Sequence, residues 1–257
     1  KALCSTLNIK EVKLYSPSGK EIKLDTTKPE TVESESEISK PETTESESTE
    51  SEITNSSGEN DQITDGIKLF IGQDNESIYH YLDSGKFPKA PGITLYTSLY
   101  DLAGVYSDAD WGAGRTNMVE ATNKYNYADL AVGLSLTEEK FPTGLADIVK
   151  GKWDNNIDRL GQFIKSIAPN EVYLRIGYEF DGPWNNYQPE QYKAAFKYIR
   201  DRLESKGVTN VNYVWQACTY VYNFNMLPLE TWYPGDDYVD YMALSFFFFA
   251  EGPKDGS

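Results

Sequence analysis

Short apolar runs alternate with longer amphipathic stretches along the chain from residue 66 onward. Six runs have strand length and hold many β-branched and aromatic residues: 67–72, 92–97, 128–135, 172–178, 210–216 and 239–246. Between them, apolar positions recur at helical spacing, which predicts helices over 76–82, 117–124, part of 145–167 and 189–206. Strands separated by helices form parallel βαβ units, so this part of the chain is of the α/β class.

Two α/β architectures fit this alternation, the (β/α)8 TIM barrel and the doubly wound sheet. A doubly wound dinucleotide fold carries Gly-x-Gly-x-x-Gly after its first strand, and the motif does not occur there. The sequence therefore favours a TIM barrel, and we expect about six of its eight βα units within residues 66–257.

The chain before residue 66 has a different pattern. Residues 8–15 and 21–24 flank a Ser-Pro-Ser-Gly turn, which predicts a hairpin, and we expect residues 1–27 to be the remnant of an upstream β-module. Residues 28–65 are rich in Glu, Ser, Thr and Pro, and within them residues 28–61 hold 11 acidic residues and 2 lysines, or −9 of the net charge of −16. We expect a disordered linker that acts as a spacer, with an acidic interaction segment as the alternative.

Composition argues against several partners. Outside residues 28–61 the chain is mildly acidic, so we expect no nucleic-acid partner. No apolar run is long enough to cross a bilayer, and we expect no membrane partner. His80 is the one histidine and lies in a predicted helix, and there is no Cys/His cluster with metal-ligand spacing. We therefore expect neither a metal nor another cofactor.

The strongest candidate chemistry lies in residues 172–187, Val-Tyr-Leu-Arg-Ile-Gly-Tyr-Glu-Phe-Asp-Gly-Pro-Trp-Asn-Asn-Tyr. A strand here leads into Glu179, beside Tyr178 and further aromatic residues. An acid at the rigid rim of a barrel, close to flat aromatic faces, suits the cleavage of sugars. The alternative is a surface glutamate at a strand end, followed by a packed tryptophan.

Other predicted strand ends and loops bring polar and aromatic groups to the same rim of the barrel. Few of these groups are cationic, which suits a neutral polysaccharide better than a phosphate ester. The candidates for contact with such a substrate are Asp74, Trp111, Tyr178, Trp184, Asn185, Trp215 and Phe246.

Arg175 lies within the strand that precedes Glu179. If its side chain faces the barrel interior, it needs a carboxylate partner. Two interpretations remain open: the guanidinium hydrogen-bonds close to Glu179, or it forms a purely structural ion pair inside the barrel.

The stretch Arg-Ile-Gly-Tyr-Glu-Phe-Asp-Gly-Pro-Trp-Asn resembles the clan-A glycoside hydrolases, as do Asp-Trp-Gly-Ala-Gly, Val-Trp-Gln and Tyr-Pro-Gly-Asp-Asp-Tyr-Val-Asp. Within the clan, the β-mannanase-like barrels of glycoside hydrolase family 26 are the most similar. The resemblance covers residues 66–257. It implies a retaining, endo-acting hydrolase of a plant β-glycan, with β-mannan favoured over xylan or mixed-linkage glucan.

The resemblance also implies roles for single residues. Glu179 matches the family's general acid/base, and Trp184 matches a tryptophan that shapes a sugar subsite. Trp111 and Trp215 would add stacking surfaces, and Tyr178 or Asn185 would hydrogen-bond the sugar or the nucleophile. Family 26 usually has histidine directly before the acid/base, where this chain has Tyr178. This departure suggests a divergent branch and leaves other β-glycans open as substrates.

In the clan-A enzymes the nucleophile is a glutamate at the end of the seventh strand, whereas Ser257 follows the sixth. Glu251 lies in a loop and does not match that position. We therefore expect the nucleophile beyond Ser257, and we expect this chain alone to be inactive and poorly stable. The alternative function is a non-catalytic barrel that binds polysaccharide. Either hypothesis implies a secreted, modular protein whose linker tethers the barrel to carbohydrate-binding or other modules.

Overall fold

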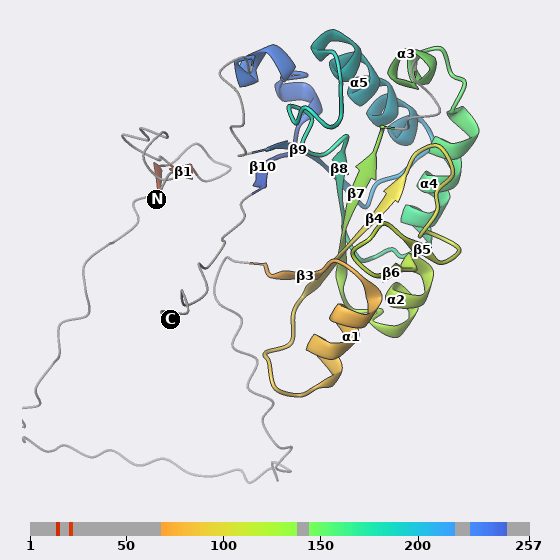
Figure 1. Ribbon diagram of the computed structural model, residues 1–257, viewed down its shortest axis with the longest axis vertical. Coiled ribbons are helices and arrows are strands. Elements are labelled where there is room, and N and C mark those ends of the chain that lie inside the picture. Colours follow the sequence, from red (N-terminus) through yellow and green to blue (C-terminus); the bar gives the residue numbers. More distant parts are fainter. Residues whose placement is uncertain (1–13, 16–20, 23–67, 138–143, 219–226, 246–257) are drawn as a thin grey trace, which may run out of the picture. The chain divides into compact units, whose positions relative to one another are not determined.

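The computed structural model describes five parts of the chain: residues 14–15, 21–22, 68–137, 144–218 and 227–245 (Figure 1). The chain divides into two compact units, Lys1–Ser57 and Gly58–Ser257. In the first unit, β1 (Leu14–Tyr15) pairs antiparallel with β2 (Glu21–Ile22), where the sequence predicts a hairpin. The linker lies outside the described residues, so the division into hairpin remnant, linker and barrel stays a prediction.

A six-stranded parallel sheet is the framework of the second unit. Its strands are β3 (Phe70–Gly72), β4 (Gly92–Ser98), β7 (Asp129–Ser135), β8 (Val172–Ile176), β9 (Val211–Cys218) and β10 (Tyr241–Ser245). All five neighbouring pairs are parallel, and the strands are ordered along the sheet as they are along the chain. A doubly wound sheet reverses its order partway. The sequential order therefore confirms the predicted TIM barrel, here as a partial barrel with β3 and β10 at its edges.

Helices connect these strands. They are α1 (Asn75–Asp83), α2 (Met118–Lys124), α3 (Gly144–Val149), α4 (Asp154–Ser166) and α5 (Pro189–Ser205), with two short 3-10 helices, η1 (Leu229–Trp232) and η2 (Asp236–Tyr238). Local sequence fixes where several begin: the side chains of Asp74 and Asn117 cap α1 and α2, and Pro189 starts α5. Figure 1 shows α1, α2, α4 and α5 on the same side of the sheet.

The helix predicted within residues 145–167 is α4, and the structure adds α3 before it, with Gly151 at a left-handed φ of +77° between the two helices. Several element boundaries differ from the sequence prediction. β8 ends at Ile176 rather than at 178, since Gly177 is also left-handed. β9 instead continues to Cys218. The predicted loop 98–115 contains β5 (Ala109–Asp110), which pairs with β6 (Arg115–Thr116).

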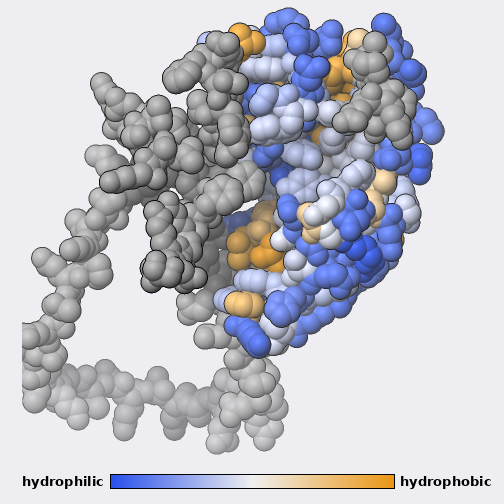
Figure 2. All heavy atoms as spheres, viewed as in Figure 1, coloured by the Kyte–Doolittle hydropathy of each residue, from blue (hydrophilic) through white to orange (hydrophobic). Residues whose placement is uncertain are grey.

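The main core lies between the sheet and the helices. In β8, Val172, Leu174 and Ile176 are fully buried on this side, whereas Tyr173 and Arg175 alternate onto the other face. The buried faces of α4 and α5 complete the core, with Ile157, Leu160, Phe163, Ile164, Tyr192, Ala195, Phe196, Ile199 and Leu203. The visible outer surface of the unit is mostly hydrophilic (Figure 2).

Replacing Leu174 by alanine should lower the free energy of unfolding by about 2–5 kcal/mol, because it leaves a cavity beside the central strand. Urea unfolding followed by circular dichroism measures this change. Lys193→Ala is the matched control, since it removes only an exposed ion pair with Glu190 and should cost about 0–1 kcal/mol. Equal losses for the two variants would contradict the assignment of Leu174 to the core.

Candidate active site

Glu179 lies in a tight turn directly after β8. Its φ is +54°, a left-handed conformation that side chains other than glycine rarely adopt. Its backbone N–H donates to the carbonyl of Gln216 in β9 at 2.9 Å, and its own carbonyl accepts from the N–H of Gly182 at 2.8 Å. The position of Glu179 is therefore set by hydrogen bonds to the sheet and to the turn.

Asn185 completes the hydrogen bonding of this turn. Its side-chain Nδ2 donates to the carbonyl of Glu179 at 2.7 Å and to that of Tyr178 at 3.2 Å. Its Oδ1 accepts from the hydroxyl of Thr137 at 3.0 Å. The sequence predicts that Asn185 contacts a sugar or a second catalytic group. The structure instead commits its amide to the backbone that carries Glu179.

Glu179 lines a cleft of about 420 Å³ at the carboxyl ends of the strands. Among the described residues that line this cleft, Glu179 is the one carboxylate, and none is a lysine or arginine. Two other predicted site residues, Trp111 and Tyr178, join it there. The full lining is Gln73, Tyr96, Thr97, Ser98, Trp111, Ala113, Gly114, Thr116, Ser135, Thr137, Tyr178 and Glu179.

Arg175 faces the interior of the partial barrel. Its guanidinium donates to the hydroxyl of Thr94 at 2.9 Å and, at 3.3 Å, to the side-chain oxygen of Gln216. It also lies 4.8 Å from the ring centroid of Tyr96 and 5.9 Å from that of Tyr178. Within the described part of the chain these partners are all neutral. Among the described residues Arg175 therefore forms no ion pair. Its bond to Gln216 does lie close to Glu179, whose backbone N–H donates to the carbonyl of the same residue.

Tyr178 forms an aromatic pair at the cleft wall. Its ring meets Tyr96 edge to face, with centroids 5.2 Å apart. Burial raises the pKa of the Tyr178 hydroxyl above its usual value of 10.0. The hydroxyl therefore stays protonated at neutral pH and can donate a hydrogen bond.

The other two predicted tryptophans take different positions. Trp184 is 49% exposed and packs over Gly182, where an added Cβ would lie 2.5 Å from the indole ring. It flanks the turn and is not among the residues that line the cleft. Trp215 is only 6% exposed and stacks on Phe180 with centroids 4.7 Å apart. Trp215 shares a face of β9 with Tyr213 and Ala217, and this face packs into the main core. The structure therefore does not bring Trp215 to the site.

Asp74 is not among the described residues that line the Glu179 cleft. The carboxylate of Asp74 accepts from the backbone N–H of Ser77 at 2.9 Å as the cap of α1, and the residue is 7% exposed. It lines a separate hollow beside α1. Phe246 lies outside the described residues.

Several polar residues of the cleft are absent from the sequence prediction. Tyr96 and Ser98 come from β4, and Ser135 and Thr137 from the end of β7. The signal that could find them is the period of two along β4, where Thr94, Tyr96 and Ser98 share one face. Asp181 was also missed: its Oδ1 accepts from the N–H of Cys218 at 2.6 Å, which ties the turn to β9 a second time.

The described residues give no sign of a metal centre or a membrane span. They contain no group of three or more His, Cys, Asp or Glu side chains that could hold a metal ion. No helix among them is long and apolar enough to cross a bilayer.

Comparisons with known proteins give a consistent result. Residues 150–255 match Glycosyl hydrolase family 26. Beta-1,3-xylanase TXYA from Vibrio sp is 38% identical over 189 residues, which are 71% of this chain and 38% of that protein. A Beta-1,3-xylanase from Alcaligenes sp is 36% identical over 186 residues, with the same coverage. The chain therefore spans well under half the length of these relatives.

Among solved structures, GH26A from Muricauda sp. MAR_2010_75 is similar in fold. The TM-score is 0.50 and the identity 20%, over 69% of this chain and 67% of that one. This likeness concerns the fold alone and agrees with a partial barrel.

Replacing Glu179 by glycine should leave the chain about 0.5–1 kcal/mol more stable than replacing it by alanine. A left-handed residue with a Cβ costs about 1–2 kcal/mol, which exceeds the extra chain entropy of about 0.4–1 kcal/mol that glycine loses on folding. The same pair of replacements at Glu190, in the first turn of α5, should give the opposite order. Urea unfolding of the four variants tests this, and an alanine more stable than glycine at 179 would contradict it.

Proposed function

Since the chain is a family-26-like relative of the clan-A (β/α)8-barrel glycoside hydrolases, we propose that the protein carrying it is an endo-acting β-glycanase in which Glu179 is the general acid/base. The observation that carries the proposal is the placement of Glu179. Both the backbone N–H and the backbone carbonyl of Glu179 are hydrogen-bonded. The residue lines a cleft that also contains aromatic rings and hydroxyl groups. Glycoside hydrolysis requires an acid held in a fixed position beside groups that can bind a sugar.

The cleft lining favours a neutral, hydroxyl-rich substrate. Trp111 is 50% exposed and offers a flat apolar face, and the hydroxyl of Tyr178 can donate a hydrogen bond to a sugar oxygen. The described lining residues include no cation to bind a phosphate or a sugar acid. Because two relatives are named as β-1,3-xylanases, we place β-1,3-linked xylan ahead of β-mannan, which the sequence resemblance favours.

In the proposed mechanism Glu179 first acts as an acid. Its proton passes to the glycosidic oxygen as the bond from that oxygen to the anomeric carbon breaks, and the leaving sugar departs as an alcohol. Glu179 then acts as a base, taking a proton from the water that attacks the anomeric carbon. In a retaining reaction a second carboxylate, about 5–5.5 Å away, bonds to the anomeric carbon as the leaving sugar departs, and this bond breaks when the water attacks. We propose that this carboxylate comes from residues outside the described part of the chain.

A non-catalytic barrel that binds polysaccharide is the second candidate. It is favoured by a single observation, that Glu179 is the one carboxylate among the described lining residues of the cleft. On either proposal the protein is secreted, and residues 28–65 tether the barrel to another module such as a carbohydrate-binding one.

Replacing Glu179 by glutamine in the protein that carries this chain should reduce kcat on β-1,3-xylan by about 10²–10⁴-fold, because the amide cannot donate or accept the proton that the reaction moves. Binding of xylo-oligosaccharides, measured by calorimetry, should persist. Glu190→Gln alters an exposed carboxylate of α5 and is the control. Undiminished turnover by Glu179→Gln would refute the acid/base role, and binding without turnover in the parent protein would favour the non-catalytic candidate.

The substrate assignment has a separate test. The value of kcat/KM for β-1,3-linked xylo-oligosaccharides should exceed that for manno-oligosaccharides of equal length by roughly 10–100-fold, since the two sugars differ in linkage, in configuration at C2 and in the hydroxymethyl group at C5. Product analysis by chromatography should show internal cleavage. Faster cleavage of the mannan series would restore the substrate that the sequence resemblance favours.

A further inference from the structure

The short hairpin β5–β6 carries Trp111 at its tip. Asp110 shapes the turn, because its Oδ1 accepts from the backbone N–H of Gly112 at 2.8 Å and of Gly114 at 3.3 Å. Both glycines are left-handed, with φ of +89° and +113°. Only four residues form the paired strands of this hairpin, so its own ladder is too short to fix its position.

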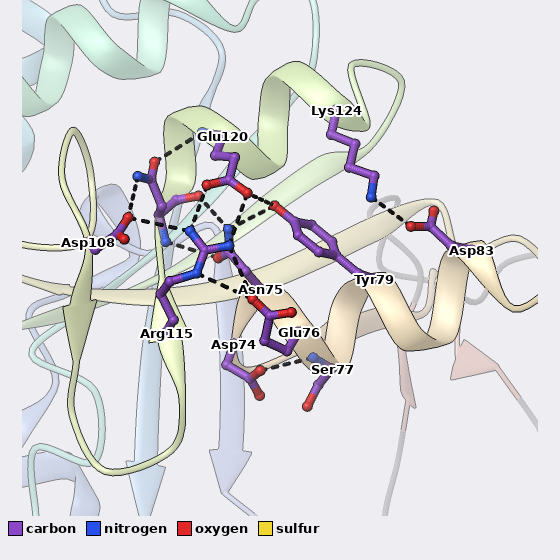
Figure 3. Close-up of polar contacts among 11 residues, drawn as sticks. Asp74, Asn75, Glu76, Ser77, Tyr79, Asp83, Asp108, Arg115, Glu120 and Lys124 are labelled. Atoms are coloured by element: carbon purple, nitrogen blue, oxygen red, sulfur yellow. Dashed lines mark hydrogen bonds and ion pairs between the residues drawn. The ribbon is translucent and has the colours of Figure 1, made fainter.

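Arg115 joins the base of this hairpin to two helices (Figure 3). Its guanidinium donates to both carboxylate oxygens of Glu120 in α2, at 2.6 and 3.0 Å. It also reaches Glu76 in α1 at 3.2 Å and Asp108 before β5 at 3.4 Å. Three carboxylates from three segments therefore converge on one cation.

The acceptors are themselves held in place. The hydroxyl of Tyr79 in α1 donates to Oε1 of Glu120 at 2.6 Å. Asn117 donates from Nδ2 to Asp108 at 2.8 Å while its Oδ1 caps α2. The hydrogen bonds from Arg115 and Tyr79 lower the pKa of Glu120 to about 2, so the cluster stays charged at neutral pH.

A second contact seats the hairpin on α1. An added Cβ at Gly114 would lie 2.8–3.0 Å from the side chain of Asp74, the cap of α1. The backbone at Gly114 thus approaches α1 as closely as a glycine allows. This contact and the bonds of Arg115 hold the hairpin so that Trp111 lines the cleft. Trp111 itself is half exposed.

We propose that Arg115 is a positioning residue for substrate binding, which clamps the β5–β6 hairpin to α1 and α2 so that Trp111 is held in the Glu179 cleft before the glycan arrives. The inference rests on the proposed function. Glu76 and Asp108 are 67% and 61% exposed, so their ion pairs with Arg115 contribute little to folding stability. Ordering a binding side chain in advance instead lowers the entropy cost of binding, so the effect of the clamp is expected in KM.

The test compares Arg115→Met with a matched control in the protein that carries this chain. Arg115→Met should raise KM for xylo-oligosaccharides roughly 3- to 10-fold, the range that corresponds to loss of one well-ordered aromatic contact, with kcat unchanged. Arg115→Lys should recover part of the loss. Arg202→Met is the control: it also removes a guanidinium bound to two carboxylates, those of Asp154 and Asp158, but from the α4–α5 interface. It should leave KM unchanged.

A double-mutant cycle tests whether the clamp acts through Trp111. In a Trp111→Ala background, Arg115→Met should raise KM no further. Additive effects of the two replacements, or an equal rise in KM for Arg202→Met, would overturn the inference.

A readout without catalysis separates this inference from the proposed function. Acrylamide should quench the fluorescence of Trp111 more strongly in Arg115→Met, measured as the difference between each protein and its Trp111→Phe counterpart. Unchanged quenching would overturn the clamp even in an active enzyme. Increased quenching in a protein that cleaves no glycan would support the clamp and refute only the proposed function.

Discussion

The left-handed turn after β8 is the constraint on which the candidate site depends. Parallel strands end at a common edge, but a regular strand through residue 179 would continue to alternate its side chains across the sheet. The left-handed φ of Glu179 breaks this pattern. The N–H of Glu179 donates to the carbonyl of Gln216 in β9, and its carbonyl accepts from Gly182 and Asn185. Because one of these partners belongs to the sheet, the position of the acid follows from strand pairing.

A layer of polar side chains supports the same region from inside the barrel. Arg175 connects β4, β8 and β9 through Thr94, Tyr96 and Gln216. Gly133 in β7 makes room for it, since an added Cβ would lie 2.4 Å from the ring of Tyr96 and 3.1 Å from the guanidinium. Through Tyr96, which lines the cleft, these contacts connect the cleft wall to the interior of the sheet. The hairpin with Trp111 is attached separately, through charged groups on the surface.

The sequence was sufficient to predict the framework and to single out two residues that line the cleft, Glu179 and Tyr178. Period-two and helical spacing located all six strands of the sheet, and the aromatic segment after β8 identified Glu179 and Tyr178. It could not give the role of Asn185, because a hydrogen bond from Nδ2 to the carbonyl of Glu179 depends on a left-handed turn that no spacing encodes. It also misplaced Trp215, which lies on the core-facing side of β9 together with Tyr213 and Ala217. The sequence did not predict the ion-pair cluster of Arg115, because its three carboxylate partners are distributed over residues 76–120.

The most direct test of the account is the dependence of the Glu179→Ala defect on the leaving group. A general acid matters most when the departing oxygen is strongly basic and least when it leaves readily as a weak base. Glu179→Ala should therefore cleave a dinitrophenyl glycoside of the preferred sugar far closer to the parental rate than it cleaves a sugar–sugar bond. Added azide should also react in place of the water that Glu179 activates, giving a glycosyl azide. An equal loss of rate on both substrates, with no azide product, would contradict an acid/base role for Glu179.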